Sequence, residues 1–534
     1  MRFVYVPLIL IGLEGSAPAL APIGAQRPAM QENLGTHHYS VNASPAAQRY
    51  FDQGLRLFWA FNHAEAIRSF HEAERLDSTC AMCAFGVALA YGPNINAPMT
   101  RLAADSALAA SKRAQWRASD PNEVELIDAL AERYASTDST LRARQDTAYM
   151  RAMRRVVARE PRNLEARVLF ADALMNLSPW NYWYSDGSMR PGTRTVLEQL
   201  DTVLKADPDH PGACHLYIHA VEARYPERAV HCAERLASLM PGAGHLVHMP
   251  AHVYIRVGRY ADAAEANRRA AHIDHVSFDA PGAVRRGIYP SGYMPHNHHF
   301  LSFAASMMGA SQLAIDQAFQ AAADVDPAVA ADLPWVEAIM PIGYQTLVTF
   351  AQWDRILAEP PPPVEHQFAL GMSFYARGVA FAAKKRWAES NAALDSVGRI
   401  ASAFPKGDNK SALLIAERAL EGEIDMRRGS MSAAVRSFQS AVILEDGTPY
   451  NEPPIWYYPM RHSLGKALIL SGRFVEAEEV YRRDLERFPE NGWSLYGLAQ
   501  ALKGRGKLSE AGQVLDRFNR AWAKADIKID GSRL

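Results

Sequence analysis

The stretch that decides the fold spans residues 46–77 and reads AAQRYFDQGLRLFWAFNHAEAIRSFHEAERLD. Gly54 is followed by Ala66 after 12 residues and by Phe70 after 16 residues. Two amphipathic helices joined by a short turn at Asn62 would bring these positions to the place where the helices cross. The stretch therefore predicts a pair of closely crossed helices.

The same spacing returns near the C-terminus, at Gly422, Ala434 and Phe438 and again at Gly465, Ala477 and Tyr481. This pattern resembles the tetratricopeptide repeat, a helix–turn–helix unit of about 34 residues with small residues at the helix crossing. The resemblance implies an all-α protein, a right-handed TPR-type α-solenoid of about ten to twelve helix pairs. It also implies that the first helix of each pair lines a concave surface.

The repeat pattern divides the chain into regions. We expect a flexible leader at 26–44, N-terminal TPR-like helix pairs at 45–208, histidine-rich units at 209–330 and C-terminal TPR units at 331–534. Loop insertions rich in Trp, Tyr, Pro and Gly interrupt the array, and this composition favours packed lids over free linkers. They are SPWNYWYSDGSMRPG at 178–192, PGAVRRGIYPSGY within 275–294, and EDGTPYNEPPIWYYP at 445–459.

Composition limits the classes of partner. The formal net charge is -1 and no basic block stands out, so a nucleic-acid partner is not favoured. No run of about twenty apolar residues follows the N-terminus, so no membrane span is expected in the mature chain. The partner that the repeat resemblance implies is a peptide or protein ligand in the concave groove.

The N-terminal residues predict export. A short apolar run, MRFVYVPLILIGL, leads through small residues to Ala25, which is typical of a signal peptide cleaved near that residue. The mature protein would then be periplasmic or secreted. In an oxidising compartment the C-x-x-C pair Cys80 and Cys83 favours a local disulfide over a metal site, and Cys214 and Cys232 are expected as a disulfide or as two buried thiols.

Histidines are concentrated in the central region, where eleven of the 18 lie between residues 215 and 299. Spacings of three and four residues keep such side chains on one helical face. In two successive units they stand 13 and 10 residues before a turn glycine. These pairs are His245 and His248 before Gly258, and His296 and His299 before Gly309.

Three consecutive first helices would turn these histidines into one groove, where neutral imidazole is a common ligand for transition metals. Copper and zinc are the expected ions, and no nucleotide cofactor is indicated. His298 lies off the common face and at most orients a ligand, whereas His462 would contribute from across the groove. The predicted metal ligands are His215, His219, Glu222, His245, His248, His252, His296 and His299.

Two functions remain open at this point. One is an exported metalloprotein, catalytic if the metal keeps an open position. The other is a TPR scaffold that binds a peptide or partner protein without metal. No H-E-x-x-H, G-x-S-x-G, Walker or G-x-G-x-x-G motif specifies an enzyme class. Imidazole nitrogens clustered within about 4–5 Å would favour the metal.

Overall fold

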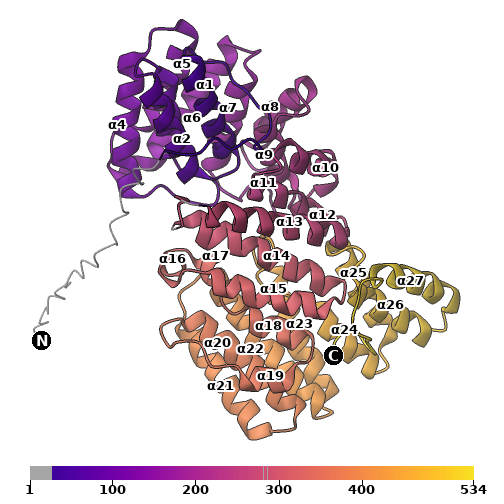
Figure 1. Cartoon of the computed structure of the whole chain (residues 1–534). Coiled ribbons are helices and arrows are strands. Elements are labelled where there is room, and N and C mark those ends of the chain that lie inside the picture. The colour runs from indigo at the N-terminus through magenta and orange to yellow at the C-terminus, as the bar shows by residue number, and fades with distance from the viewer. Residues whose placement is uncertain (1–26, 281, 286) are drawn as a thin grey trace, which may run out of the picture.

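A computed structural model describes residues 27–280, 282–285 and 287–534. Within these ranges the protein is helical, with isolated β-bridges at Asn94–Ala97 and Trp183–Met189. Consecutive helices pack against one another in pairs (Figure 1), which confirms the all-α, TPR-type solenoid. The N-terminal helices are α1 (Pro45–Trp59), α2 (His63–Leu76), α3 (Ala81–Ala90), α4 (Arg101–Arg117), α5 (Pro121–Arg133), α6 (Arg142–Arg159), α7 (Leu164–Asn176) and α8 (Thr193–Ala206).

The central and C-terminal helices continue the array. The central ones are α9 (Pro211–Val221), α10 (Val230–Leu239), α11 (Gly244–His248), α12 (Pro250–Arg256), α13 (Tyr260–Asp279), α14 (Met294–Met307) and α15 (Ser311–Asp324). Short helices follow as α16 (Pro327–Asp332), α17 (Pro334–Glu337), α18 (Ile342–Thr349) and α19 (Trp353–Ala358). The last pairs are α20 (Gln367–Ala383) with α21 (Trp387–Ala403), α22 (Asp408–Arg427) with α23 (Met431–Asp446), α24 (Met460–Leu470) with α25 (Phe474–Arg487), and α26 (Gly492–Gly504) with α27 (Leu508–Ala521).

Glycines at the helix crossings explain the repeated spacing. A Cβ atom at Gly54 would lie 2.6 Å from the ring of Phe70, and one at Gly422 would lie 2.5 Å from Phe438. Only a residue without a side chain allows the aromatic ring to seat against the opposing backbone. At the turn predicted near Asn62, the Asn62 side chain accepts the backbone N–H of Glu65 and so caps α2.

The segment before α1 corrects one expectation. The sequence predicts a flexible leader at 26–44, but its described part, residues 27–44, packs along the N-terminal helices. Leu34 is buried, the N–H of Val41 donates to Gln48 over 2.9 Å, and the N–H of Gly242 donates to the carbonyl of Asn33 over 2.8 Å. Side-chain and backbone hydrogen bonds hold this segment, so apolar periodicity did not reveal it.

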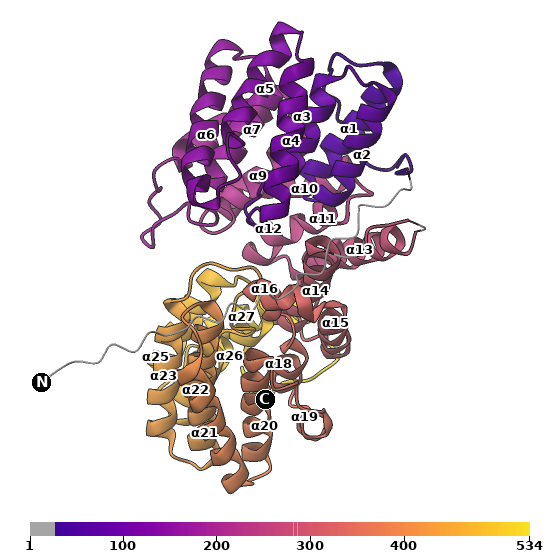
Figure 2. The same ribbon diagram turned by 90° about the vertical axis from the view of Figure 1, so that its left-hand side faces the viewer.

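The C-terminal end of the solenoid returns to its centre, where the end of α25 contacts the end of α12. Trp493 on α26 donates its indole N–H to the carbonyl of Ser306 on α14 over 2.8 Å. Arg256 on α12 donates to the carbonyl of Arg487 over 3.2 Å. One large buried core fills the N-terminal half as far as Met308, and a second fills the C-terminal half. The two halves meet at the central helices (Figure 2).

Other expectations concern the termini and the cysteines. The signal peptide expected at residues 1–25 lies outside the described residues. In the ranges that the structure covers, no helix has the length and apolar character that crossing a bilayer requires. Cys80 and Cys83 form the local disulfide, whereas Cys214 and Cys232 are two buried thiols.

Candidate metal centre

Four helices bring the central histidines together. His215 and His219 lie on α9, His245 and His248 on α11, and His252 on α12, while α14 carries His296 and His299. Two groups form, in each of which the ring nitrogens approach one another within 4.8 Å. The first group, called trio A, is His215, His219 and His245, and the second, called trio B, is His248, His252 and His296.

In trio A the hydrogen bonds fix the protonation of two rings. Nδ1 of His215 lies 2.6 Å from the backbone carbonyl of Trp59. A carbonyl oxygen can only accept, so this Nδ1 carries the proton of the neutral ring. Nδ1 of His219 donates to Oε1 of Glu222 over 2.9 Å. In both rings Nε2 is therefore left with a lone pair.

Trio B repeats this arrangement with different partners. Nδ1 of His248 lies 2.6 Å from Oδ1 of Asn267, and the Asn267 amide group donates to the carbonyl of Ala263, which identifies Oδ1 as an acceptor. Nδ1 of His252 donates to Oε2 of Glu222 over 2.6 Å. These two rings also keep their lone pairs on Nε2.

The free lone pairs face one another. Nε2 of His215 lies 3.1 Å from Nε2 of His219, and Nε2 of His248 lies 2.8 Å from Nε2 of His252. With no proton between them, two such nitrogens repel each other, but a cation would bind both. Two nitrogens at about 2.0–2.1 Å from one ion lie roughly 2.8–3.4 Å apart for bond angles of 90–110°. Both distances fit that geometry.

Glu222 joins the two trios. It is fully buried, and each carboxylate oxygen accepts from a different trio. Burial would raise the pKa of Glu222, but the His252 and His219 imidazoles outweigh it and lower the pKa to about 2. The sequence predicts Glu222 as a ligand, and it lies with His219 and His252 in a group that could hold a metal ion. In this arrangement its two oxygens orient the rings of His219 and His252. Such partners set the tautomer and orientation of metal-binding histidines.

Burial keeps the imidazoles neutral, which is the form that binds metal. It lowers the pKa of His215, His245, His248 and His296 well below the usual value, with neighbouring histidines adding to the effect in each case. It also lowers the pKa of His299, to about 4. Both ring nitrogens of His245 are buried and have no hydrogen-bond partner among the described residues.

The two trios are neighbours on one cavity of about 540 Å³. Ring centroids lie 5.4 Å apart between His219 and His252 and 5.7 Å apart between His245 and His248. Five of the predicted ligands line the cavity, namely His219, His245, His252, His296 and His299. This volume is in the range of small-molecule sites and is enclosed on several sides.

The insertions pack over the cavity and form its other walls together with α17, α18 and the start of α22. Trp180 from the first insertion and Tyr293 from the second line it, and the ring of Trp180 lies 5.1 Å from that of His219. The third insertion, in the C-terminal half, contributes Tyr450 and Glu452. Sequence reasoning expected lids here and considered Tyr293 beside the ligands, but it did not identify Trp180, Tyr450 or Glu452 as cavity residues.

Glu452 is the buried acid of this cavity. Tyr450 donates its hydroxyl to Oε1 of Glu452, while Oε2 is buried without a hydrogen-bond partner in the part of the chain that is described. Burial raises the pKa of Glu452 to about 7, although Arg256 acts in the opposite direction. A carboxyl group with such a pKa can accept or release a proton near neutral pH.

Several other residues considered from the sequence lie elsewhere. His299 lines the cavity, but its ring centroid is 6.4 Å from that of His296, and it belongs to neither trio. His298 faces His275 instead of the cavity. His462 does not reach across the groove, because its Nε2 pairs with Asp484 over 3.2 Å.

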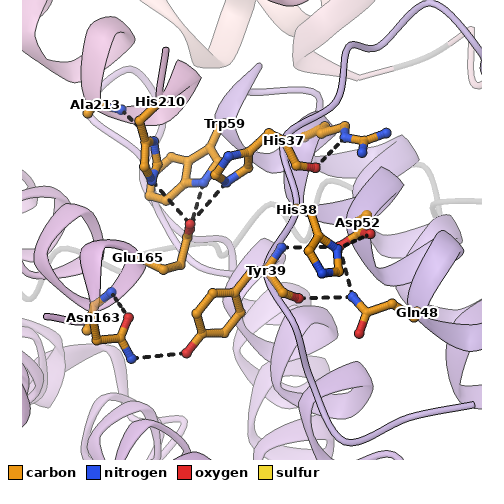
Figure 3. A network of polar contacts seen from close by, with 12 residues as sticks. His37, His38, Tyr39, Gln48, Asp52, Trp59, Asn163, Glu165, His210 and Ala213 are labelled. Carbon is orange, nitrogen blue, oxygen red and sulfur yellow. Dashed lines mark hydrogen bonds and ion pairs between the residues drawn. The ribbon is translucent and has the colours of Figure 1, made fainter. Parts of the chain in front are cut away.

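A third histidine group, His37 and His210 with Glu165, is also close enough together to hold a metal ion. It differs from the trios in its hydrogen bonds (Figure 3). The Glu165 carboxylate accepts the indole N–H of Trp59 over 2.8 Å and lies 3.1 Å from Nε2 of His37. Nδ1 of His210 accepts the N–H of Ala213, so neutral His210 carries its proton on Nε2, which points 3.3 Å from Glu165. No lone pair of His210 faces the carboxylate, and this group is a hydrogen-bonding hub.

Comparison with known proteins identifies the repeats. The family model for the tetratricopeptide repeat matches residues 468–521, from the end of α24 through α27. The matched segment is a tetratricopeptide repeat, and the paired helices in the rest of the described chain have the same architecture. No curated protein matches its sequence significantly.

Solved structures give a distant likeness. The human IFIT1 dimer with m7Gppp-AAAA shares 13% identity, with 90% of this chain and 91% of that chain covered at a TM-score of 0.33. The human IFIT1 dimer with PPP-AAAA shares 13% identity, with coverages of 91% and 92% and a TM-score of 0.34. The repeat assignment rests on the family match and on the helix pairs.

Proposed function

We propose that the protein is an exported TPR-repeat metalloprotein with two neighbouring histidine-bound ions, copper or zinc, at trios A and B. The observation that carries this proposal is the pair of facing Nε2 lone pairs, each fixed by an Nδ1 partner on the far side of the ring. A groove that merely binds a peptide would not need unprotonated nitrogens 2.8 and 3.1 Å apart.

The cavity supports a catalytic role for the ions. Structural metal sites are closed by protein ligands, whereas catalytic sites keep a position open to a small molecule. Here the predicted ligands border a cavity of about 540 Å³, and Glu452 on its wall supplies a group that titrates near pH 7. No Lys or Arg is among the described residues that line it, so these walls suit neutral molecules better than anions.

Two features support export. The Cys80–Cys83 disulfide suits an oxidising compartment, and the N-terminal apolar run has the composition of a signal peptide. A periplasmic or secreted location agrees with both.

Elemental analysis of untagged protein tests the proposal. After exposure to copper, zinc and iron and removal of loose metal, we expect about two transition-metal ions per chain at trios A and B. The His248→Ala/His252→Ala variant should lose at least one of them, while His272→Ala, on the exposed side of α13, should lose none. Fewer than one ion per two chains in the parent protein would refute the proposal and favour a metal-free TPR scaffold that binds a peptide or partner protein.

A further inference from the structure

Three side chains on consecutive helices meet outside the central cavity. His275 lies on α13, His298 on α14, and Asp324 is the last residue of α15. One ligand atom from each lies within 4.8 Å of the others. None of the three lines the cavity of trios A and B, so they form a separate cluster.

The ring of His298 is oriented as the rings of trios A and B are. Its Nδ1 lies 2.6 Å from Oε1 of Gln317, an acceptor, and so carries the proton. The lone pair on Nε2 then faces Nε2 of His275 at 3.1 Å and Oδ2 of Asp324 at 3.6 Å. The partner on α15 thus leaves the metal-binding nitrogen free on the side where the other two groups lie.

Asp324 is held in a matching way. Its Oδ1 accepts the side-chain N–H of Gln320 over 2.9 Å. Its Oδ2 is buried and has no hydrogen-bond partner among the described residues. A buried carboxylate oxygen without a donor is costly, and a bound cation removes that cost.

We propose that His275, His298 and Asp324 form a third metal site, which takes Zn²⁺ with water in the fourth position. Two imidazole nitrogens and one carboxylate oxygen are a common zinc donor set. The distances of 3.1 and 3.6 Å are close to the roughly 3.3–3.6 Å between ligands of a tetrahedral ion with bonds of about 2.0–2.2 Å. The Glu165 group lacks this feature, because Nε2 of His210 presents a proton there.

A zinc ion at this site would hold α14 in place against its neighbouring helices. This helix carries His296 and His299 at the cavity and His298 at the zinc site. An ion held by α13, α14 and α15 fixes the three helices against one another at the end of the 275–294 insertion. The third site is independent of trios A and B in its ligands, and it positions one of the helices that line the cavity.

Zinc titration of the metal-free full-length chain, followed by calorimetry and by elemental analysis, tests this inference. The His275→Ala variant should bind about one zinc ion fewer per chain than the parent, because His275 is partly exposed and its removal leaves the core intact. His272→Ala, one turn earlier on α13, is the matched control and should bind the parent number. Asp324→Asn, which keeps the shape of the side chain, should weaken the same site by at least tenfold.

The His248→Ala/His252→Ala background separates this inference from the proposed function. There, His275→Ala should still remove about one further zinc ion, and Co²⁺ substitution should lose the visible absorption of one tetrahedral site. An equal zinc number in the parent and in His275→Ala would overturn the inference, whatever happens at trios A and B. Zinc held at this cluster only above about 100 μM would overturn it too, since a zinc site with three protein ligands should bind far more tightly.

Discussion

Replacing Glu222 by Gln is the sharpest test of how the two trios are organised. The carboxylate accepts Nδ1–H from His219 and from His252 at 2.9 and 2.6 Å. A glutamine amide has one oxygen and one NH₂ group, so it can accept from only one of these rings. The other ring must place its lone pair on Nδ1 and its proton on Nε2, which removes one metal-binding nitrogen.

The expected effect follows from that loss of one oriented ligand. Removal of a residue that orients a metal-binding histidine costs about 10–100-fold in affinity, or roughly 1.4–2.7 kcal/mol. Competition of the Glu222→Gln variant with a chromophoric chelator for Cu²⁺ or Zn²⁺ measures this directly. One ion per chain should weaken by that factor, while the other is held nearly as in the parent.

Glu165→Gln is the matched control, because Glu165 is also a buried carboxylate between two histidines. It should lower thermal stability yet leave metal affinity unchanged. If Glu222→Gln binds both ions as tightly as the parent does, Glu222 does not orient the ligands and the lone-pair argument fails.

Three further changes test other parts of the structure. Burial raises the pKa of Glu445 from 4.5 to about 7, so the folded state loses stability as pH rises between these values. In urea unfolding, Glu445→Gln should therefore raise the free energy of unfolding by about 1–3 kcal/mol at pH 8 and change it little at pH 4.5. Gly465→Ala would place a Cβ 2.2 Å from the Tyr481 ring and should cost about 1–3 kcal/mol in the same assay, whereas Gly512→Ala, with nothing within 4 Å, should add about 0.5–1 kcal/mol. In copper-loaded protein, the affinity for the azide anion should fall on the order of tenfold as pH rises through 7, because Glu452 becomes negatively charged and repels it. Glu452→Gln should remove this pH dependence. A pH profile in the variant equal to that of the parent would contradict a role for Glu452 in the cavity.

The helix pairs were predictable because each crossing leaves a local signature. Gly54 and Phe70 are 16 residues apart, and the same geometry returns wherever that spacing does. The common direction of the histidines was predictable for the same reason, since register relative to Gly258 and Gly309 fixes which face a side chain occupies. Both properties depend on residues that are close in the sequence, so the helical period determines them.

What the sequence could not reveal depends on contacts between distant residues. The carbonyl of Trp59 orients His215 from 156 residues away, and Glu452 reaches the cavity from the C-terminal half. Every residue has a backbone carbonyl, so the sequence does not show which one orients a histidine. Likewise, the sequence shows a glutamate at 222 but not whether it binds metal or orients two rings. His298, one residue from His299, turns to another site because a step of one residue rotates a side chain by about 100° around the helix.

The return of α26 and α27 to the central helices makes the cavity depend on both ends of the solenoid. In an open repeat array each unit stabilises only its neighbours, and the terminal pair frays without consequence for the middle. Here the hydrogen bond from Trp493 to Ser306 joins α26 to the central helix α14. Fraying of the last helix pair would therefore loosen α14 and admit solvent to the histidines. Exchange of bound metal should therefore accelerate at denaturant concentrations well below those that unfold the chain.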